Sequence, residues 1–432
     1  MKGALRRLLL ATLQDLALER VIPERVGVRD GVLEIDDEHI DLKGFKKIVL
    51  VAIGKAAFPM ARSMQRLIDP LVASGVVVSP EPAPSQLPYM LHYRGGHPYP
   101  TAESQYAAQV ILTLVGQLHQ QHLIIYLLSG GGSAIVEKPI DPSITLHDLR
   151  EFYRVLVTCG AGIVEMNVLR KHFSATKGGR LAEAGQGARQ VTLYVSDVPP
   201  DRPSTVASGP TMPDESTLDD CRAILERLGI RERLPASCRA LLDSGSLPET
   251  PKPSSPAFKR SSWHALLSII EGLDRLEASA RAEGWVVERD LSVDDWPLDP
   301  AADHLLGRLE KLRAQHPGRV VAVSTGGELS SPVTGDGLGG RNQAFVLACA
   351  ARIAGKNVAL ISAGTDGIDG NSPAAGAVAD GETIARARAA GLEPAQHFAR
   401  SDSYGFFSQL GDTLVTGATG NNIRDLRLLV AW

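Results

Sequence analysis

The feature that most constrains this sequence is a short apolar run that recurs and each time ends abruptly in small or polar residues. Runs rich in Val, Ile and Leu occur at 46–57, 122–134, 190–201, 319–328 and 357–370, with a weaker run at 412–422. Such runs are typical of strands buried on both faces of a parallel sheet. Helix-like patterns lie between them, at 102–118, 146–158, 216–228, 264–283, 301–315, 341–354 and 382–390. The alternation predicts an α/β fold built on mainly parallel sheets flanked by helices.

A chain of 432 residues is long enough for two or three domains. The stretch from about 235 to 260 is rich in Pro and Ser and has no periodicity, which indicates a surface linker. We therefore expect a larger N-terminal α/β domain over 1–240, a linker over 241–260 and a smaller C-terminal α/β domain over 261–432.

The overall charge argues against several classes of partner. Net charge is −4, which gives no reason to expect nucleic acid or an anionic membrane as a partner. The apolar run near the N-terminus is short and reads as an amphipathic helix, and no stretch has the roughly 18 apolar residues of a membrane span. The four cysteines show no C-x-x-C spacing and are read as reduced thiols. We expect a cytoplasmic protein, with a homodimer as a possible assembly.

A triple-glycine loop follows one apolar run directly. Gly130, Gly131, Gly132 and Ser133 stand where a strand is expected to end. Glycines let backbone N–H groups approach an anion, so the loop is a candidate phosphate cradle. Lys55 follows the first run, and ligands of α/β folds gather at the carboxyl ends of strands. The alternative is an ordinary tight turn beside a solvated lysine.

A second candidate is the segment 165–181, which concentrates cations in a chain of negative net charge. Asn167, Arg170 and Ser174 share one face of a predicted helix through i+3 and i+4 steps. Lys177 follows shortly after. The cluster suits a small anionic substrate, and a solvated helix end fits the spacing equally well.

Acidic residues also follow the apolar runs. These residues are Asp197, Glu328, Asp366 and Asp369. Carboxylates near glycine loops are what a Mg²⁺–nucleotide site needs, because Mg²⁺ takes oxygen ligands and bridges phosphates. The same residues could instead cap helices or stabilise turns.

Two sequence motifs are typical of nucleotide-binding loops. The P-loop pattern is absent. Gly335, Gly337 and Gly340 match G-x-G-x-x-G, but about ten residues separate them from the preceding run, so the match is weak as a dinucleotide fingerprint. Since this loop opens a predicted helix with Arg341 at its mouth, it remains a candidate anion site.

Several stretches together resemble the glycerate 2-kinase family that carries the MOFRL domain. They are "GKAAFPMA", "GGHPYP", "SGGGSA", "EMNVLRKHFSATKGGRLA", "SDVPPDRPSTVASGPT", "GGRNQAFVLA", "AGTDGIDGNSPAAGA" and "SDSYGFF". The resemblance implies phosphorylation of D-glycerate at its 2-hydroxyl by ATP, with Mg²⁺ as metal. It also implies two α/β domains with the active site in the cleft between them.

The resemblance assigns roles to individual positions. Lys55 and Arg341 resemble the family's active-site cations, and Asp197, Glu328 and Asp366 its carboxylates, for catalysis or for Mg²⁺. Gly130–Ser133, with Glu328 and Asp366, would bind the nucleotide. Asn167, Arg170 and Lys177 would bind the substrate.

The sequence departs from the family's pattern at five positions: Gly162, Pro200, Arg202, Ala418 and Asn421. Two alternatives stay open. One is an NAD(P)H-dependent reductase of hydroxypyruvate or tartronate semialdehyde, which the weak dinucleotide fingerprint disfavours. The other is a nucleotide- or metabolite-binding protein that has lost catalysis.

Overall fold

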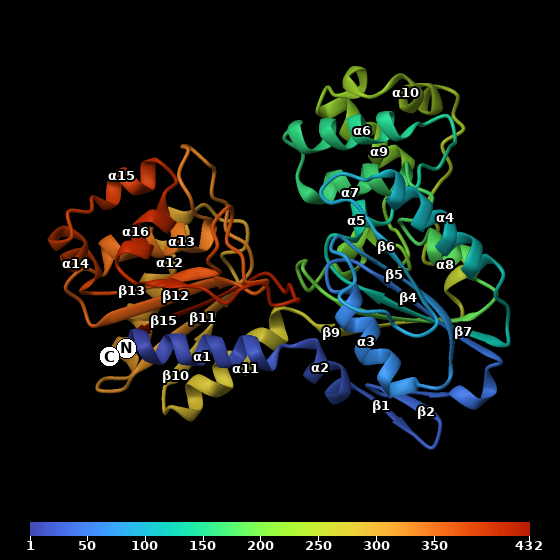
Figure 1. Cartoon of the computed structure of the whole chain (residues 1–432). Coiled ribbons are helices and arrows are strands. Elements are labelled where there is room, and N and C mark those ends of the chain that lie inside the picture. The colour runs from blue at the N-terminus through green and yellow to red at the C-terminus, as the bar shows by residue number, and fades with distance from the viewer. The chain divides into compact units, whose positions relative to one another are not determined.

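The computed structural model describes all 432 residues and divides the chain into two compact units. The N-terminal unit comprises Leu18–Leu266, and the C-terminal unit comprises Met1–Ala17 together with Leu267–Trp432. Both units are built of helices and strands, so the predicted α/β class is confirmed (Figure 1).

A six-stranded sheet organises the N-terminal unit. Its strand order is β6-β5-β4-β7-β8-β9, and the first four neighbouring pairs are parallel. A small antiparallel sheet of β1, β2 and β3 precedes it. The strands of this unit are β1 (Val26–Arg29), β2 (Val32–Ile35), β3 (Glu38–Asp41), β4 (Lys47–Ile53), β5 (Val72–Ser79), β6 (Met90–Arg94), β7 (His122–Leu128), β8 (Arg189–Val195) and β9 (Ser261–Leu267).

The side of the sheet to which the chain adds strands changes between β4 and β7. From β4 the chain builds β5 and β6 on one side, then crosses back and adds β7 and β8 on the other side. Ligands of open α/β sheets bind outside the carboxyl ends of the strands at such a switch point. The predicted loop at 130–133 and Lys55 follow these two strands directly.

Helices complete the N-terminal unit. α6, α7, α9 and α10 lie together at one end of it and share an apolar core (Figure 1). Thr101, Thr145 and Thr217 begin α4, α6 and α9 with capping boxes, which satisfy N–H groups that a helix leaves unpaired. The α-helices are α2 (Leu18–Arg25), α3 (Ala57–Ile68), α4 (Ala102–Gly116), α5 (Gly132–Ile135), α6 (Leu146–Thr158), α7 (Ile163–His172), α8 (Arg180–Ala184), α9 (Leu218–Arg227) and α10 (Ala236–Asp243), and the 3-10 turns are η1 (Leu42–Gly44), η2 (Pro203–Ser208), η3 (Arg231–Arg233) and η4 (Pro256–Phe258).

The C-terminal unit contains a second six-stranded sheet, of order β10-β11-β15-β12-β13-β14. Only β10 and β11 pair in parallel, so the expectation of a mainly parallel sheet is wrong for this unit. The last strand inserts antiparallel between β11 and β12, and β13 pairs antiparallel with both β12 and β14. The strands are β10 (Val286–Arg289), β11 (Val321–Gly326), β12 (Val358–Gly364), β13 (Gly376–Asp380), β14 (Thr413–Leu414) and β15 (Asp425–Ala431).

The helices of the C-terminal unit include the first helix of the chain. α1 lies beside α11, so the blue and yellow helices run next to each other (Figure 1). The helices are α1 (Lys2–Asp15), α11 (Ile269–Ala282), α12 (Leu298–Gln315), α13 (Arg341–Arg352), α14 (Thr383–Ala389), α15 (Pro394–Ala399) and α16 (Ser403–Gln409).

The division of the chain differs from the expected boundaries at both ends. α1 joins the C-terminal unit because Leu5 and Leu9 are fully buried and Lys2 pairs with Asp412. The expected linker, 241–260, belongs to the N-terminal unit, where Glu249 accepts hydrogen bonds from His172 and from the backbone of Leu218.

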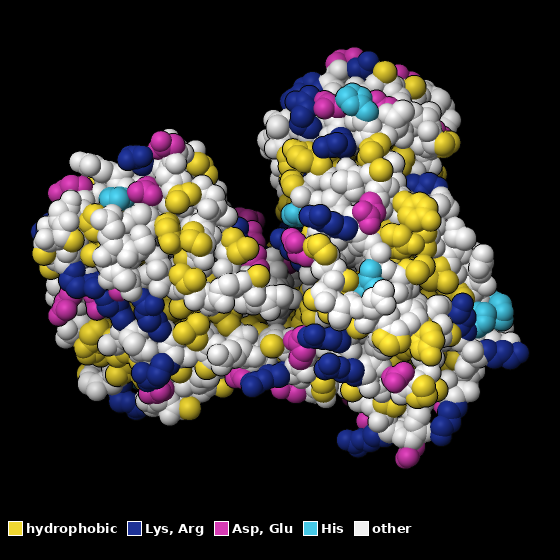
Figure 2. Space-filling model, viewed as in Figure 1, with side chains coloured by type: hydrophobic (Ala, Val, Ile, Leu, Met, Phe, Trp, Pro, Cys, Tyr) yellow, Lys and Arg dark blue, Asp and Glu magenta, His cyan; other side chains and the backbone are white.

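The surface agrees with the small net charge. On the visible face, Lys and Arg side chains alternate with Asp and Glu (Figure 2). No helix combines the length and the apolar character needed to cross a bilayer.

Candidate functional site

The structure brings Lys55 and the triple-glycine loop together at the switch point of the N-terminal sheet. The Lys55 backbone N–H donates to the Gly130 carbonyl oxygen over 2.9 Å, and the Ala56 N–H donates to Ser129 Oγ over 3.0 Å. Gly131 has φ +83°, and a Cβ there would lie 3.2 Å from Lys55 Cγ. The two segments are therefore tied by hydrogen bonds, and the left-handed φ at Gly131 favours glycine there.

A side chain at either of the other two glycines of the loop would also meet a neighbour. A Cβ at Gly130 would collide with the carboxylate of Asp197, which follows β8. A Cβ at Gly132 would lie 2.6 Å from the Cβ of Ala207. Bare backbone at these positions lets Asp197 approach the loop, so Lys55, the glycines and Asp197 form one cluster at neighbouring strand ends.

Ser133 ends a chain of hydrogen-bonded side chains. Ser208 Oγ donates to Asn167 Oδ1 over 2.9 Å, and Ser133 Oγ lies 2.6 Å from Ser208 Oγ. Since the Ser208 proton is directed to Asn167, the Ser133 proton must be directed to Ser208. Ser133 then offers only lone pairs to a ligand.

The backbone beneath this chain is strained. Ala207 and Ser208 both have left-handed conformations, with φ of 51° and 60°. Each such non-glycine residue costs on the order of 1–3 kcal/mol, and strain of this kind gathers at functional sites. It holds the buried Ser208 hydroxyl against Ser133.

The Lys177 side chain lies in the interior beneath the glycine loop. Its ammonium is fully buried and pairs with Glu137, which also accepts from Ser174 Oγ over 2.6 Å. Burial lowers the pKa of Lys177, and the neighbouring carboxylate of Glu137 opposes that shift. The Tyr153 hydroxyl lies 2.6 Å from Glu137 Oε2 and 2.7 Å from the Ser133 carbonyl oxygen. Through the contact of Tyr153 with the Ser133 carbonyl oxygen, this buried network is connected to the glycine loop.

Arg170 and His97 complete the N-terminal cluster. The Arg170 guanidinium lies 5.0 Å from the centre of the Tyr153 ring, and its buried Nε has no hydrogen-bond partner. His97 approaches the loop at Gly131. Burial lowers the pKa of His97, and the charge of Lys55 lowers it further, which favours the neutral ring.

In the C-terminal unit, Arg341 begins α13 and is held by two carboxylates. It donates from Nε to Asp425 Oδ2 over 2.6 Å, and Nη2 lies 3.0 Å from Glu328 Oε1. Burial alone would raise the pKa of Asp425, but Arg427 and Arg341 outweigh it and lower that pKa. Asp425 is therefore a charged anchor that fixes the direction of Arg341.

The glycine loop before α13 does not offer that helix N-terminus to an anion. Asp369 accepts from the backbone N–H groups of Asn342 and Gln343 over 3.0 and 2.8 Å, and from both side-chain amides. Its own carboxylate caps the helix. The backbone N–H groups of Asn342 and Gln343 are therefore already bonded, and the anion site expected at Gly335, Gly337 and Gly340 with Arg341 stays a prediction.

The predicted metal-binding carboxylates lie in both units. Asp197 belongs to the N-terminal unit, and Glu328 and Asp366 follow β11 and β12 of the C-terminal unit. No group of three or more His, Cys, Asp or Glu side chains is arranged to hold a metal. Asp366 is partly exposed, and a role for it and Glu328 as Mg²⁺ ligands stays a prediction.

Sequence reasoning missed several members of these clusters. Glu137, Tyr153 and Ser208 act through contacts between distant segments, which spacing does not reveal. Asp425 and Arg427 stand in an apolar run, and two charges there were a signal for a buried pair. Asn421, one of the departures from the family pattern, donates to the Leu16 carbonyl oxygen over 2.9 Å and fastens α1.

A lysine beside bare glycine backbone at neighbouring strand ends suits a small-molecule phosphotransferase, since phosphoryl transfer requires mainly positioning and charge neutralisation. Residues 4–243 match the family described as a domain of unknown function (DUF4147), and residues 321–425 match the MOFRL family. The chain belongs to the glycerate kinase family that carries the MOFRL domain.

Individual relatives cover nearly the whole chain. A D-glycerate 2-kinase from Thermotoga maritima is 34% identical over 95% of this chain and 94% of its own length. A protein from Agrobacterium vitis named putative hydroxypyruvate reductase is 36% identical over 89% of this chain and 87% of its own length. The crystal structure of glycerate kinase from Thermotoga maritima matches with a TM-score of 0.86 and 31% identity, covering 100% of this chain and 99% of that one.

Proposed function

We propose that this protein transfers the γ-phosphoryl group of ATP to the 2-hydroxyl of D-glycerate and so forms 2-phospho-D-glycerate and ADP. The observation that carries the proposal is the pairing of Lys55 with the triple-glycine loop at the switch point of a parallel sheet. A lysine ammonium beside bare backbone suits a phosphate, and family membership supports glycerate as the acceptor.

The charged side chains divide into two roles. Lys55 and Arg341 neutralise the charge of the transferring phosphoryl group. The Lys55 backbone is bonded to the glycine loop, and the Arg341 side chain, at the start of α13, is held by Asp425. Asp197, beside the glycine loop, takes the proton from the 2-hydroxyl as that oxygen attacks the γ-phosphorus. The bond between the γ-phosphorus and the bridging oxygen breaks, and ADP leaves with that electron pair.

The metal belongs with the C-terminal carboxylates. Glu328 and Asp366 would hold Mg²⁺ together with the phosphate oxygens of the nucleotide. The ion would supply positive charge against the β- and γ-phosphates. Since Arg341 already contacts Glu328, the same carboxylate would connect the cation and the metal.

The substrate is held by the N-terminal cluster. Arg170, whose buried Nε has no partner, is the candidate for the glycerate carboxylate. Ser133 accepts from a glycerate hydroxyl, and Asn167 acts through Ser208 to fix that polarity. Lys177 acts indirectly, because its ammonium is bound to Glu137.

The test is ADP release that depends on D-glycerate. Wild-type protein with MgATP should form ADP only when D-glycerate is present. Lys55→Met should lower kcat/KM by about 10²- to 10³-fold, as the loss of one transition-state charge contact does. Lys46→Met, at an exposed lysine near the start of β4, is the matched control and should keep wild-type turnover. Unchanged turnover in folded Lys55→Met would contradict the assignment.

A second candidate function has specific support. The N-terminal strand order is the one that dinucleotide-binding folds use, and the relative from Agrobacterium vitis carries a reductase name. The turn after β4 reads "GKAA", however, without the glycines that a pyrophosphate of NAD requires. Oxidation of D-glycerate with reduction of NAD⁺ or NADP⁺, followed at 340 nm, would favour the reductase.

Other expectations stay predictions. They are the cytoplasmic location, the homodimer and the placement of the active site between two domains. A protein that binds ATP in calorimetry but forms no ADP with glycerate would favour the third alternative, a binding protein without catalysis.

A further inference from the structure

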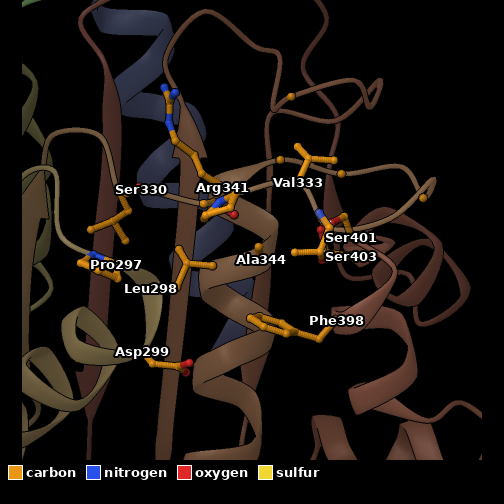
Figure 3. Close-up of a pocket in the computed structure, with 18 of the residues that line it drawn as sticks. Pro297, Leu298, Asp299, Ser330, Val333, Arg341, Ala344, Phe398, Ser401 and Ser403 are labelled. Atoms are coloured by element: carbon orange, nitrogen blue, oxygen red, sulfur yellow. Dashed lines mark hydrogen bonds between the residues drawn. The ribbon is translucent and has the colours of Figure 1, made fainter. Parts of the chain in front are cut away.

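A cavity in the C-terminal unit has no role in the site described above. Its volume is about 760 Å³, within the range of pockets that hold small organic ligands. Its floor is the first turns of α13, at Gly340 and Ala344. Leu298 and Phe398 face each other across it from opposite walls (Figure 3).

The lining of the cavity favours an uncharged part of a ligand. Only two charged side chains line it, Asp299 and Arg341. Asp299 accepts from Arg352 over 2.8 Å, and Arg341 is paired with Asp425 and Glu328. Asp369 has already bonded the first N–H groups of α13. An anion would therefore find no free cation or helix terminus inside.

The cavity nevertheless reaches Arg341, the side chain to which the proposed function assigns the phosphates. Arg341 borders it, and its side chain extends away from Leu298, Ala344 and Phe398 (Figure 3). A ligand whose anionic end meets this guanidinium can lay an uncharged end between the two apolar walls. Three serines that line the cavity, Ser330, Ser401 and Ser403, carry hydroxyl groups for polar edges of a ligand.

We propose that this cavity binds the nucleoside part of the phosphoryl donor, with the base between Leu298 and Phe398 and the phosphates toward Arg341. The inference rests on the proposed function, because it takes the donor to be a nucleoside triphosphate. A nucleoside is uncharged, has a flat apolar ring and carries polar edges, and these properties match the floor, walls and rim.

Filling the cavity tests the proposal. Ala344→Phe projects a ring from the floor, and Ala344→Ser is the matched control that leaves the space open. Ser330→Trp, at an exposed position on the rim, fills the cavity from another element if the helix variant fails to fold. Binding of adenosine and of tripolyphosphate to the full chain is measured by calorimetry.

Wild-type protein and Ala344→Ser should bind adenosine. The affinity of the filled variants for adenosine should be at least tenfold lower. Tripolyphosphate should bind all variants alike. In turnover, the filled variants should raise KM for ATP by at least tenfold and leave KM for D-glycerate unchanged.

Equal adenosine affinity in wild type and in a folded, filled variant overturns the inference, as does wild-type protein that binds tripolyphosphate but not adenosine. Failure of the proposed function has a different signature. Adenosine binding that depends on the cavity, without phosphorylation of glycerate, keeps the nucleoside site and removes the kinase.

Discussion

At the scale of single residues, steric demands and chemistry meet most closely in the glycine loop. Each of Gly130, Gly131 and Gly132 would meet a neighbour if it carried a Cβ, and the neighbours are Asp197, Lys55 and Ala207. The sequence alone indicated a glycine turn after a strand. That Lys55 and Asp197 close on this turn depends on strand order, which the sequence does not display.

Gly130→Ala tests this crowding. The added methyl group collides with the Asp197 carboxylate, so Asp197 or the loop must shift. A displacement of about 1 Å in a reacting group costs on the order of 10²-fold in rate, and we expect that loss in kcat/KM. Gly116→Ala at the end of α4, where a Cβ meets nothing closer than 3.9 Å, should be neutral. Wild-type turnover in Gly130→Ala would show that the Asp197 position is unimportant.

The buried pair below the loop is a second prediction. Lys177→Met leaves Glu137 charged and uncompensated in the interior, which should lower the free energy of unfolding by about 3–5 kcal/mol. Adding Glu137→Gln removes the unpaired charge and keeps an acceptor for Tyr153 and Ser174, so part of the loss should return. The free energies of unfolding of the single and the double variant are measured by urea denaturation. A double variant no more stable than the single one would mean that the charge is not the cause.

At the scale of elements, buried parallel strands were predictable and segments stabilised by polar contacts were not. β4, β7, β8, β11 and β12 coincide with apolar runs in the sequence. β15 escaped prediction because Asp425 and Arg427 interrupt its apolar pattern, and they are tolerated only as a buried pair with Arg341. Within 241–260, composition indicates a linker, whereas Glu249 makes several hydrogen bonds to neighbouring elements.

The pH dependence of stability should show whether Glu249 attaches the segment 241–260 to the N-terminal unit. Burial alone would raise the pKa of Glu249, but hydrogen bonds from Lys252, the Leu218 amide and His172 lower it from 4.5 to about 2. A lowered folded-state pKa stabilises the fold above about pH 4.5, and this contribution is lost as pH falls from there toward about 2. The Glu249 side chain is 40% exposed, so the contribution is modest.

Glu249→Gln removes this titration. The urea midpoint of the variant should fall less than that of wild type between about pH 6 and pH 3. Glu226→Gln, at an exposed position of α9, should follow the wild-type curve. Parallel curves for wild type and Glu249→Gln would mean that this carboxylate does not hold the segment.

At the scale of the whole molecule, the first helix belongs to the unit that closes the chain. Periodicity correctly predicted an amphipathic helix at the start, but no sequence signal tells which distant surface covers its apolar face. Lys2 pairs with Asp412, and Arg6 donates to the Thr413 carbonyl oxygen, so partners over 400 residues away fix its place.

Leu9→Ala tests this attachment. Removing a fully buried leucine should cost about 2–5 kcal/mol, and the cost should appear only in the C-terminal unit. Hydrogen exchange should show weaker protection in α11, β12 and β13, with β4 and β7 unchanged. Weaker protection in β4 and β7 would contradict the division of the chain.

The measurement that tests the central claim most directly is phosphorus NMR of the purified protein with MgATP and D-glycerate. The account predicts a new monoester signal of 2-phosphoglycerate that grows in step with ADP. A 3-phosphoglycerate signal would contradict the placement of the 2-hydroxyl beside Asp197 and keep the kinase. No new signal under conditions in which ATP binds would contradict glycerate phosphorylation itself.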